Sequence, residues 1–124
     1  MHGDVSFLEL GSPEADTSKS QVFLAAVFGW QVHPMPRGGA WFQGPRIRVG
    51  LHGNDPGPMI YVFFEVPDLE VAMEKVRQAG GHVDPSPSDE ADFGRFVTCR
   101  DPVGIPFGLH QPSSAAKGVR APSG

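Results

Sequence analysis

The sequence contains one cysteine, so it can form neither an intrachain disulfide nor a cysteine-based metal knuckle. This composition suits a reducing compartment, and we expect a cytoplasmic protein. Cys99 continues the alternating apolar positions of residues 96–98, which favours a small core residue over a catalytic thiol.

The sequence also lacks a long apolar run. The longest, residues 22–30, is far below the about 20 residues that cross a bilayer. The N-terminus has neither the basic nor the apolar segment of a signal peptide. We therefore expect neither export nor a membrane partner.

Positive charge is scarce. The chain has 10 Lys and Arg against 14 Asp and Glu, a net charge of −4, and no basic cluster longer than Arg46-Ile47-Arg48. Nucleic-acid binding requires a concentrated basic surface, so nucleic acid is not expected as a partner.

Apolar residues and turn formers are plentiful. Leu, Ile, Val and Phe make up about a quarter of the 124 residues, enough to form a core. The 16 glycines and 13 prolines predict many turns and short strands. The length suits one domain.

Three short segments recur in the same order at offsets of 51 to 58 residues, which indicates a duplicated unit. The pairs are residues 7–10 with 63–66, residues 29–36 with 80–87, and Gly50-Leu51-His52 with Gly108-Leu109-His110.

Each copy predicts one strand, one helix and three further strands. In the first copy the strands are expected at 5–10, 31–33, 40–43 and 46–52, and in the second at 59–66, 82–84, 95–100 and 105–111. The first helix, residues 19–28, is expected to begin with the capping box Ser18-x-x-Gln21 and to end at Gly29. Asp68 is expected to cap the second helix, and Gly80-Gly81 to end it. Its predicted apolar face is Leu69, Ala72, Val76 and Ala79.

These patterns predict an α+β fold in which two tandem βαβββ units form a cupped mixed sheet with the helices outside. Strand alternation places Ile47, Val49, Leu51, Ile105, Phe107 and Leu109 on the helix side. We expect one domain over residues 1–112, with units at about 5–53 and 59–111, followed by a flexible tail at 113–124.

Two stretches carry a family resemblance. Residues 23–30, with the sequence Phe-Leu-Ala-Ala-Val-Phe-Gly-Trp, and the ending Asp101-Pro102-x-Gly104-x-x-Phe107-Gly108-Leu109 resemble the glyoxalase/bleomycin-resistance/dioxygenase family. This is the vicinal oxygen chelate superfamily, and the likeness covers residues 5–112. It implies the two-unit fold. Its members include metal-dependent lyases, isomerases and dioxygenases, together with metal-free proteins that sequester drugs.

The resemblance places the family's four metal ligands on Val5, Gly50, Tyr61 and Gly108. None of them is a His or Glu, and valine and glycine have no donor atom, so we expect no metal and no other cofactor. A displaced metal site is the alternative. It would use Glu9, Glu65, His52 and His110, and it would need a bent strand or a bulge, because the glutamates and histidines lie at different heights along their strands.

Strand alternation turns ten residues toward the predicted cup. The candidate ligand-binding residues are Phe7, Glu9, Trp41, Arg48, His52, Tyr61, Phe63, Glu65, Phe96 and His110. An aromatic wall with a few polar groups is typical of a small-molecule site. The competing interpretation is that these aromatics only fill the core.

We therefore expect a metal-free protein that binds and sequesters a small, aromatic organic molecule, as in antibiotic resistance. No nucleophile motif is present, and no catalytic residue is assigned. Two alternatives stay open. One is a glyoxalase-type lyase or isomerase, or a dioxygenase, with a rebuilt metal site. The other is an accessory module for dimerisation, with a homodimer as its assembly.

Overall fold

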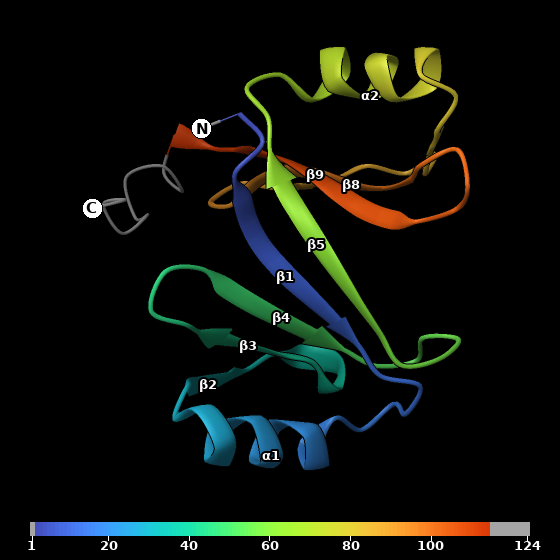
Figure 1. Cartoon of the computed structure of the whole chain (residues 1–124). Coiled ribbons are helices and arrows are strands. Elements are labelled where there is room, and N and C mark those ends of the chain that lie inside the picture. The colour runs from blue at the N-terminus through green and yellow to red at the C-terminus, as the bar shows by residue number, and fades with distance from the viewer. Residues whose placement is uncertain (1, 115–124) are drawn as a thin grey trace. The chain divides into compact units, whose positions relative to one another are not determined.

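The computed structural model describes residues 2–114 and consists of two compact units. The N-terminal unit is Phe7–Tyr61, and the C-terminal unit combines Met1–Ser6 with the chain from Val62 onward. Each unit has a mixed sheet with one helix packed on one of its faces (Figure 1).

The sheet of the N-terminal unit has the strand order β2-β3-β4-β1. Its elements are β1 (Val5–Gly11), α1 (Ser18–Phe28), β2 (Gln31–Pro34), the 3-10 turn η1 (Pro36–Gly38), β3 (Ala40–Gln43) and β4 (Arg48–His52). The α1 side of this sheet holds the core of the unit, where Phe42, Val49 and Leu51 pack with Leu24 and Trp30.

The sheet of the C-terminal unit has the order β5-β9-β8-β6, and β7 also pairs with β8. Its elements are β5 (Met59–Glu65), α2 (Leu69–Gln78), β6 (His82–Val83), β7 (Ser88–Glu90), β8 (Gly94–Arg100) and β9 (Pro106–Pro112). Its core consists of Val66, Leu69, Met73, Val97, Cys99 and Leu109.

The predicted α+β class is confirmed, and the first unit has the predicted βαβββ order; the second unit has the same order with one additional strand, β7, between β6 and β8. Gly29 and Gly80 have φ of 68° and 90°, the left-handed conformation that ends a helix without steric cost to glycine. The Asp68 side chain accepts a hydrogen bond from Val71 N, as a helix cap does. Leu51 and Leu109, the central residues of the repeated triplet, both lie in core clusters.

Helix α1 begins differently from the prediction. Its N-cap is Thr17, not Ser18, and Gln21 Nε2 donates to Thr17 Oγ1 at 3.0 Å. Thr17 is buried because its hydroxyl donates to the Gly38 carbonyl, which draws the cap into the fold. Ser18 instead bonds to the exposed Asp16 carboxylate, and this hydrogen bonding lowers the pKa of Asp16.

Two predicted core positions and one predicted strand boundary are wrong. Ile105 is 60% exposed, because the turn from Asp101 to Gly104 delays β9 until Pro106. Ala79 is exposed at the end of α2, and Met73 takes its place in the core. Ile47 precedes β4, since a turn closed by Gly44 N to Ile47 O delays the strand to Arg48.

The repeat also differs from the predicted alignment by two residues. Glu9 lies opposite Gly50 in the β1–β4 pair, whereas Phe63 lies opposite Gly108 in the β5–β9 pair. Glu9 is therefore the equivalent of Phe63, not of Glu65. A shift of two residues preserves which face a side chain occupies, so alternation alone could not detect it.

The start of the chain bonds to the C-terminal unit. Gly3 N donates to Glu65 O at 2.7 Å, and Glu65 N donates to Asp4 O at 2.8 Å. At the other end, Ser113 N donates to Phe93 O at 3.2 Å. The rest of the predicted tail, residues 115–124, lies outside the described residues. Within residues 2–114, no helix has the length and apolar character needed to span a membrane.

Candidate functional site

The sheet face of the N-terminal unit that points away from α1 carries a continuous row of side chains. The strand register aligns His33 with Trp41, Trp41 with Gly50, and Gly50 with Glu9 across four strands. Alternation places Arg48 and His52 on the same face. We call the surface formed by His33, Trp41, Arg48, Glu9 and His52 the Trp41 face.

Trp41 is covered on both sides of its indole. The His33 ring stacks on it with a centroid distance of 3.9 Å and an interplanar angle of 11°. The Arg48 guanidinium carbon lies 4.3 Å from the indole centroid. A parallel imidazole at that distance fills the space over one indole face, so the guanidinium lies over the other. Such a cation–π contact holds Arg48 in a defined place.

Glu9 occupies the space above Gly50. A Cβ built on Gly50 would lie 2.5 Å from Glu9 Oε2. The carboxylate therefore rests on bare backbone in the middle of the Trp41 face, a position that any side chain at residue 50 would obstruct.

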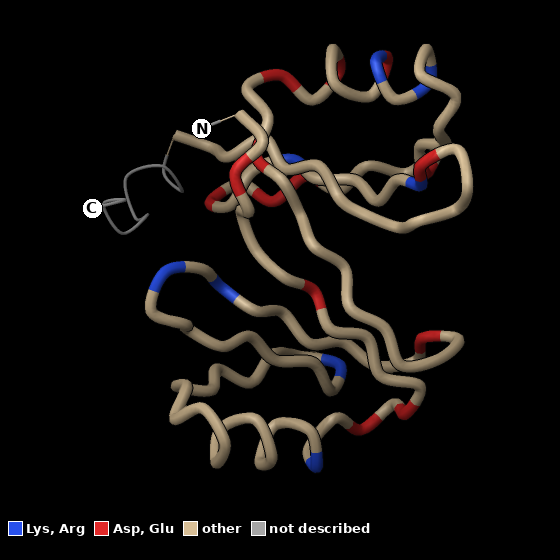
Figure 2. Tube along the Cα trace, in the orientation of Figure 1, with Lys and Arg blue, Asp and Glu red and all other residues tan. Residues whose placement is uncertain are grey.

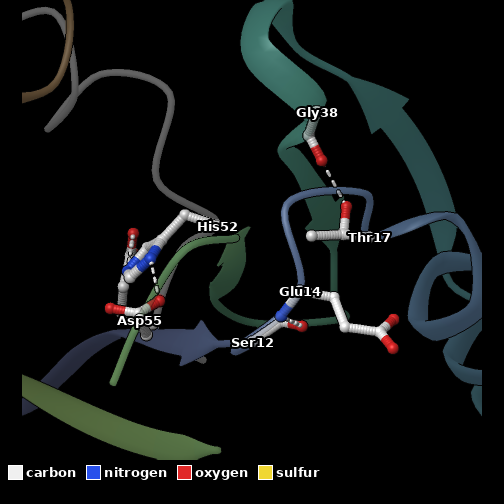
Figure 3. Close-up of polar contacts among 7 residues, drawn as sticks. Ser12, Glu14, Thr17, Gly38, His52 and Asp55 are labelled. Carbon is white, nitrogen blue, oxygen red and sulfur yellow. Dashed lines mark hydrogen bonds and ion pairs between the residues drawn. The ribbon is translucent and has the colours of Figure 1, made fainter. Parts of the chain in front are cut away.

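His52 lies between two carboxylates. Its Nδ1 is 2.5 Å from Asp55 Oδ2 (Figure 3). Its Nε2 is 3.4 Å from Glu9 Oε1. Asp55 Oδ2 is buried, and among the described residues no hydrogen bond reaches it, so its approach to Nδ1 is a close contact. The Nε2 contact is longer than an ordinary hydrogen bond. The His52 side chain is 40% exposed.

The loop that carries Asp55 makes a tight turn, which brings Asp55 next to His52. Asn54 has φ of 63°, a left-handed conformation that is uncommon for a side-chain-bearing residue. Asp55 N donates to Ser12 O at 2.9 Å. Gly11 lies beneath, and a Cβ there would come within 2.7 Å of Asp55 Oδ2. Glycine at position 11 is therefore a requirement for the Asp55–His52 contact.

The corresponding face of the C-terminal unit is packed with its own aromatic rings. Phe63 is buried, and its ring fills the space where Gly108 lacks a side chain. Phe96 meets Phe63 and Phe93 edge-on, at centroid distances of 5.9 and 5.8 Å. Phe93 stacks on His110 at 4.3 Å. These rings therefore contact one another within the C-terminal unit.

His110 is buried and its proton position is defined. Its Nε2 donates to the Phe93 carbonyl at 2.9 Å, so Nδ1 accepts from the Ser6 hydroxyl at 2.5 Å. Burial lowers the pKa of His110, and the Phe93 hydrogen bond opposes this shift. Burial also raises the pKa of the Cys99 thiol to about 11, as suits the predicted core residue.

Eight of the ten predicted site residues thus fall into two groups. Glu9, Trp41, Arg48 and His52 meet on the Trp41 face. The C-terminal unit brings together Phe63, Phe96 and His110 through ring contacts that include Phe93, and it buries Glu65. Phe7 is buried, and Tyr61 is half-buried.

Sequence reasoning missed two residues of the site. His33 lies in the strand expected at 31–33 and was not among the candidate residues, but the β2–β3 register pairs it with Trp41. The signal was its alternation with Val32 in a short strand. Asp55 gave no signal beyond a turn-forming sequence, because its role depends on the left-handed Asn54.

No protein-family model matches the chain. Among curated proteins, CFP32 of Mycobacterium bovis, whose name assigns it to the glyoxylases, is 28% identical over 108 residues, covering 77% of this chain and 41% of that protein. The anthracycline biosynthesis protein DnrV of Streptomyces peucetius is 28% identical over 129 residues, covering 86% of this chain and 46% of that protein. The chain therefore spans less than half the length of these relatives.

Solved structures share the fold. Methylmalonyl-CoA epimerase from Mycobacterium tuberculosis has a TM-score of 0.67 at 14% identity, covering 93% of this chain and 91% of that chain. Homoprotocatechuate 2,3-dioxygenase from Brevibacterium fuscum has a TM-score of 0.69 at 17% identity, covering 90% of this chain and 38% of that chain. The chain is therefore similar in sequence to a protein named as a glyoxylase and has the fold of the epimerase and dioxygenase structures, in agreement with the resemblance to the vicinal oxygen chelate superfamily.

The resemblance expects metal ligands at Val5, Gly50, Tyr61 and Gly108, and the valine and the two glycines have no donor atom for a cation. The space above Gly50 is taken by the Glu9 carboxylate, and the space above Gly108 by the Phe63 ring. Of the four residues of the displaced site, His110 uses both ring nitrogens in hydrogen bonds, to the Ser6 hydroxyl and the Phe93 carbonyl, and so has no free nitrogen for a cation. Among residues 2–114, no group of three or more His, Cys, Asp or Glu could hold a metal.

Proposed function

We propose that the Trp41 face binds a small aromatic carboxylic acid. The observation that carries this proposal is the stack of His33, Trp41 and Arg48, which holds a guanidinium beside aromatic surface on one sheet face. A guanidinium pairs well with a carboxylate, and an aromatic ring gains about 0.5–1.5 kcal/mol from a good ring contact beyond simple burial.

The names of similar proteins support this class of ligand. The homoprotocatechuate dioxygenase structure holds 3,4-dihydroxyphenylacetate, an aromatic carboxylate. DnrV is named for the biosynthesis of anthracyclines. Because both indole faces are covered, the ligand ring would contact the edge of Trp41 or extend the stack beyond the guanidinium, rather than stack on the indole itself.

Titration with 3,4-dihydroxyphenylacetate, followed by tryptophan fluorescence and calorimetry, tests the proposal. We expect Arg48→Gln to weaken binding about tenfold or more, because a charged hydrogen bond contributes about 1.5–3 kcal/mol. Trp30→Phe is the matched control, since Trp30 packs on the α1 side of the sheet. Equal affinities of the wild type and Arg48→Gln would contradict the proposal.

Sequestration without chemistry is the simplest use of such a site. Recovery of the ligand unchanged after long incubation, with protection of cells against an aromatic antibiotic, would support that interpretation. Chemical conversion of the ligand would favour the enzyme alternative. The cytoplasmic location expected from the sequence stays a prediction.

We also propose that α1 pairs with a second copy of this chain. Val22, Phe23, Val27 and Phe28 are each more than half exposed on this helix, whose only charged residue is Lys19 (Figure 2). The curated relatives are more than twice as long as the region they share with this chain. A second copy of this chain would cover the apolar surface of α1, as the additional residues of a longer relative could.

A further inference from the structure

We propose that Ser6 and His110 form a catalytic pair that hydrolyses aryl esters. Ser6 Oγ is the nucleophile, His110 Nδ1 is the general base, and the Phe93 carbonyl orients the imidazole. All three residues belong to the C-terminal unit. This activity is independent of the binding function proposed for the Trp41 face, which belongs to the N-terminal unit.

The two ring nitrogens of His110 have different partners. Nε2 lies 2.9 Å from the Phe93 carbonyl oxygen, and a carbonyl oxygen only accepts, so Nε2 carries the hydrogen. Nδ1 of the neutral ring is therefore an acceptor, and the Ser6 hydroxyl donates to it at 2.5 Å. A hydroxyl that is bonded to a base, with the base oriented by a third group, is the arrangement of an activated nucleophile.

The backbone holds the orienting carbonyl of Phe93 in place. The same oxygen accepts from Ser113 N at 3.2 Å, and Phe93 N donates to Glu90 O at 3.0 Å. Gly94 has φ of 122°, and a Cβ there would overlap the Gln111 carbonyl oxygen, so only glycine fits beside this carbonyl. The Phe93 ring also stacks on the imidazole, with a centroid distance of 4.3 Å and an interplanar angle of 18°. The carbonyl and the ring of one residue therefore fix the base.

The base is shielded, whereas the nucleophile lies near the surface. His110 is 2% exposed, while Ser6 is partly exposed and its neighbour Val5 is 42% exposed. Burial holds the pKa of His110 below its ordinary value, so the ring is neutral at pH 7 and can accept a proton. An incoming molecule therefore reaches the hydroxyl before it reaches the imidazole.

Aromatic rings beside the pair indicate the class of substrate. Phe93, which stacks on His110, meets Phe96 edge-on at 5.8 Å, and both phenylalanine rings are partly exposed. Such a surface favours a flat aromatic ring in the bound ester. A phenol also loses its proton at a pKa of about 10, so a phenolate leaves more readily than the anion of an aliphatic alcohol.

The hydrolysis takes two balanced steps. Ser6 Oγ bonds to the ester carbonyl carbon while its proton passes to His110 Nδ1, and the bond from that carbon to the aryl oxygen breaks. The departing phenolate takes the proton and leaves an acyl group on Ser6. Water then gives a proton to Nδ1 and attacks the acyl carbon, and Ser6 Oγ regains the proton as the carboxylic acid leaves. The Phe93 carbonyl stabilises the imidazolium in both steps through Nε2–H.

A fluorophosphonate probe tests the nucleophile directly, because it reacts covalently with activated serines. We expect the wild type to gain the mass of one probe, located on Ser6 by peptide mass spectrometry, and Ser6→Ala to gain none. Ser88→Ala is the matched control and should be labelled like the wild type, because Ser88 is an exposed serine in β7. A wild type without label on Ser6 would overturn the proposal.

Hydrolysis of 4-nitrophenyl benzoate, followed by the absorbance of 4-nitrophenolate, tests the catalytic pair. General base catalysis contributes about 10²–10⁴-fold, so we expect Ser6→Ala and His110→Gln to lose at least 99% of the protein-dependent rate. His82→Gln should match the wild type, which excludes hydrolysis by an exposed histidine.

Circular dichroism checks the fold of each variant. Equal rates in the wild type and Ser6→Ala would overturn the pair, and an unchanged rate in folded His110→Gln would overturn the base. Ser6→Ala removes a single oxygen atom, so it decides the outcome if His110→Gln does not fold.

Discussion

His52 and His110 end the same Gly-Leu-His triplet, but their rings have opposite surroundings. His52 is partly exposed and contacts a carboxylate through Nδ1, whereas His110 is buried and donates through Nε2 to a carbonyl. The His110 ring is therefore held in one position by the fold, and the His52 ring remains accessible to solvent.

The buried His110 should make stability depend on pH. Its pKa in the folded state lies below the ordinary value of 6.5, so the unfolded chain binds the proton more readily. Its contribution to stability is full above about pH 6.5 and is lost as the pH falls toward the folded pKa, by about 1.4 kcal/mol for each unit of difference. Urea unfolding of the wild type and of His110→Asn at a series of pH values measures the pH dependence of the unfolding free energy. An unchanged pH dependence in the variant would contradict it.

Gly50 and Gly108 provide a matched pair of substitutions. A Cβ at Gly50 meets the end of the flexible Glu9 side chain, which can move away. A Cβ at Gly108 overlaps the buried Phe63 ring, which cannot. We expect Gly50→Ala to change the unfolding free energy little and Gly108→Ala to lower it by about 1–3 kcal/mol, as overpacking does. Chemical denaturation measures the unfolding free energy of both variants. Equal losses in Gly50→Ala and Gly108→Ala would contradict this prediction.

At the scale of elements, the two helices differ in what they expose. The outer side of α2 carries charges of both signs, including Glu70, Glu74, Lys75 and Arg77 (Figure 2). Helix α1 has no residue that is fully buried, and its exposed side chains are largely apolar. An exposed helix in this fold can therefore be polar, and the apolar surface of α1 requires its own explanation.

We expect Phe23→Glu to reduce self-association, because it places a charge in the apolar surface of α1. A standard interface buries about 800 Å² per partner, which is more than one 11-residue helix provides, so the wild-type dimer should be weak, with a micromolar Kd. Val71→Glu is the control, an exposed apolar residue on α2. Analytical sedimentation of the three proteins over a series of concentrations measures their self-association. A wild type that stays monomeric would exclude the dimer.

At the scale of the whole molecule, the first residues of the chain complete the C-terminal unit. Gly3 and Asp4 bond to the backbone of Glu65, and Ser6 bonds to His110. Glu65 and His110 are both buried. Loss of residues 1–6 would therefore leave the Glu65 backbone and the His110 ring without these hydrogen-bond partners. The C-terminal unit is therefore discontinuous in sequence.

Deletion of residues 1–6 should loosen the C-terminal unit. Cys99 reports this directly, since it is buried there and its pKa of about 11 makes the folded thiol unreactive. We expect thiol labelling to be slow in the wild type and several-fold faster in the deletion variant. A deletion of residues 1–2 is the control. Equal labelling rates in all three proteins would show that the segment is dispensable.

Local patterns in the sequence determined the elements and their faces. Alternation in the strands, the Asp68 cap and the glycines that end the helices depend on neighbouring residues, so they could be read without a structure. The repeat predicted two similar units, and Cys99 was correctly placed in the core.

Only the tertiary structure decided which residues meet on those faces. The strand register pairs Glu9 with Gly50, and alternation is insensitive to a shift of two residues. The stack of His33 on Trp41 depends on pairing between strands, and the Asp55–His52 contact depends on one left-handed residue in a loop. Strand pairing and loop conformation are set by the packing of the whole unit, so sequence alternation predicted the face and the structure alone defined the site.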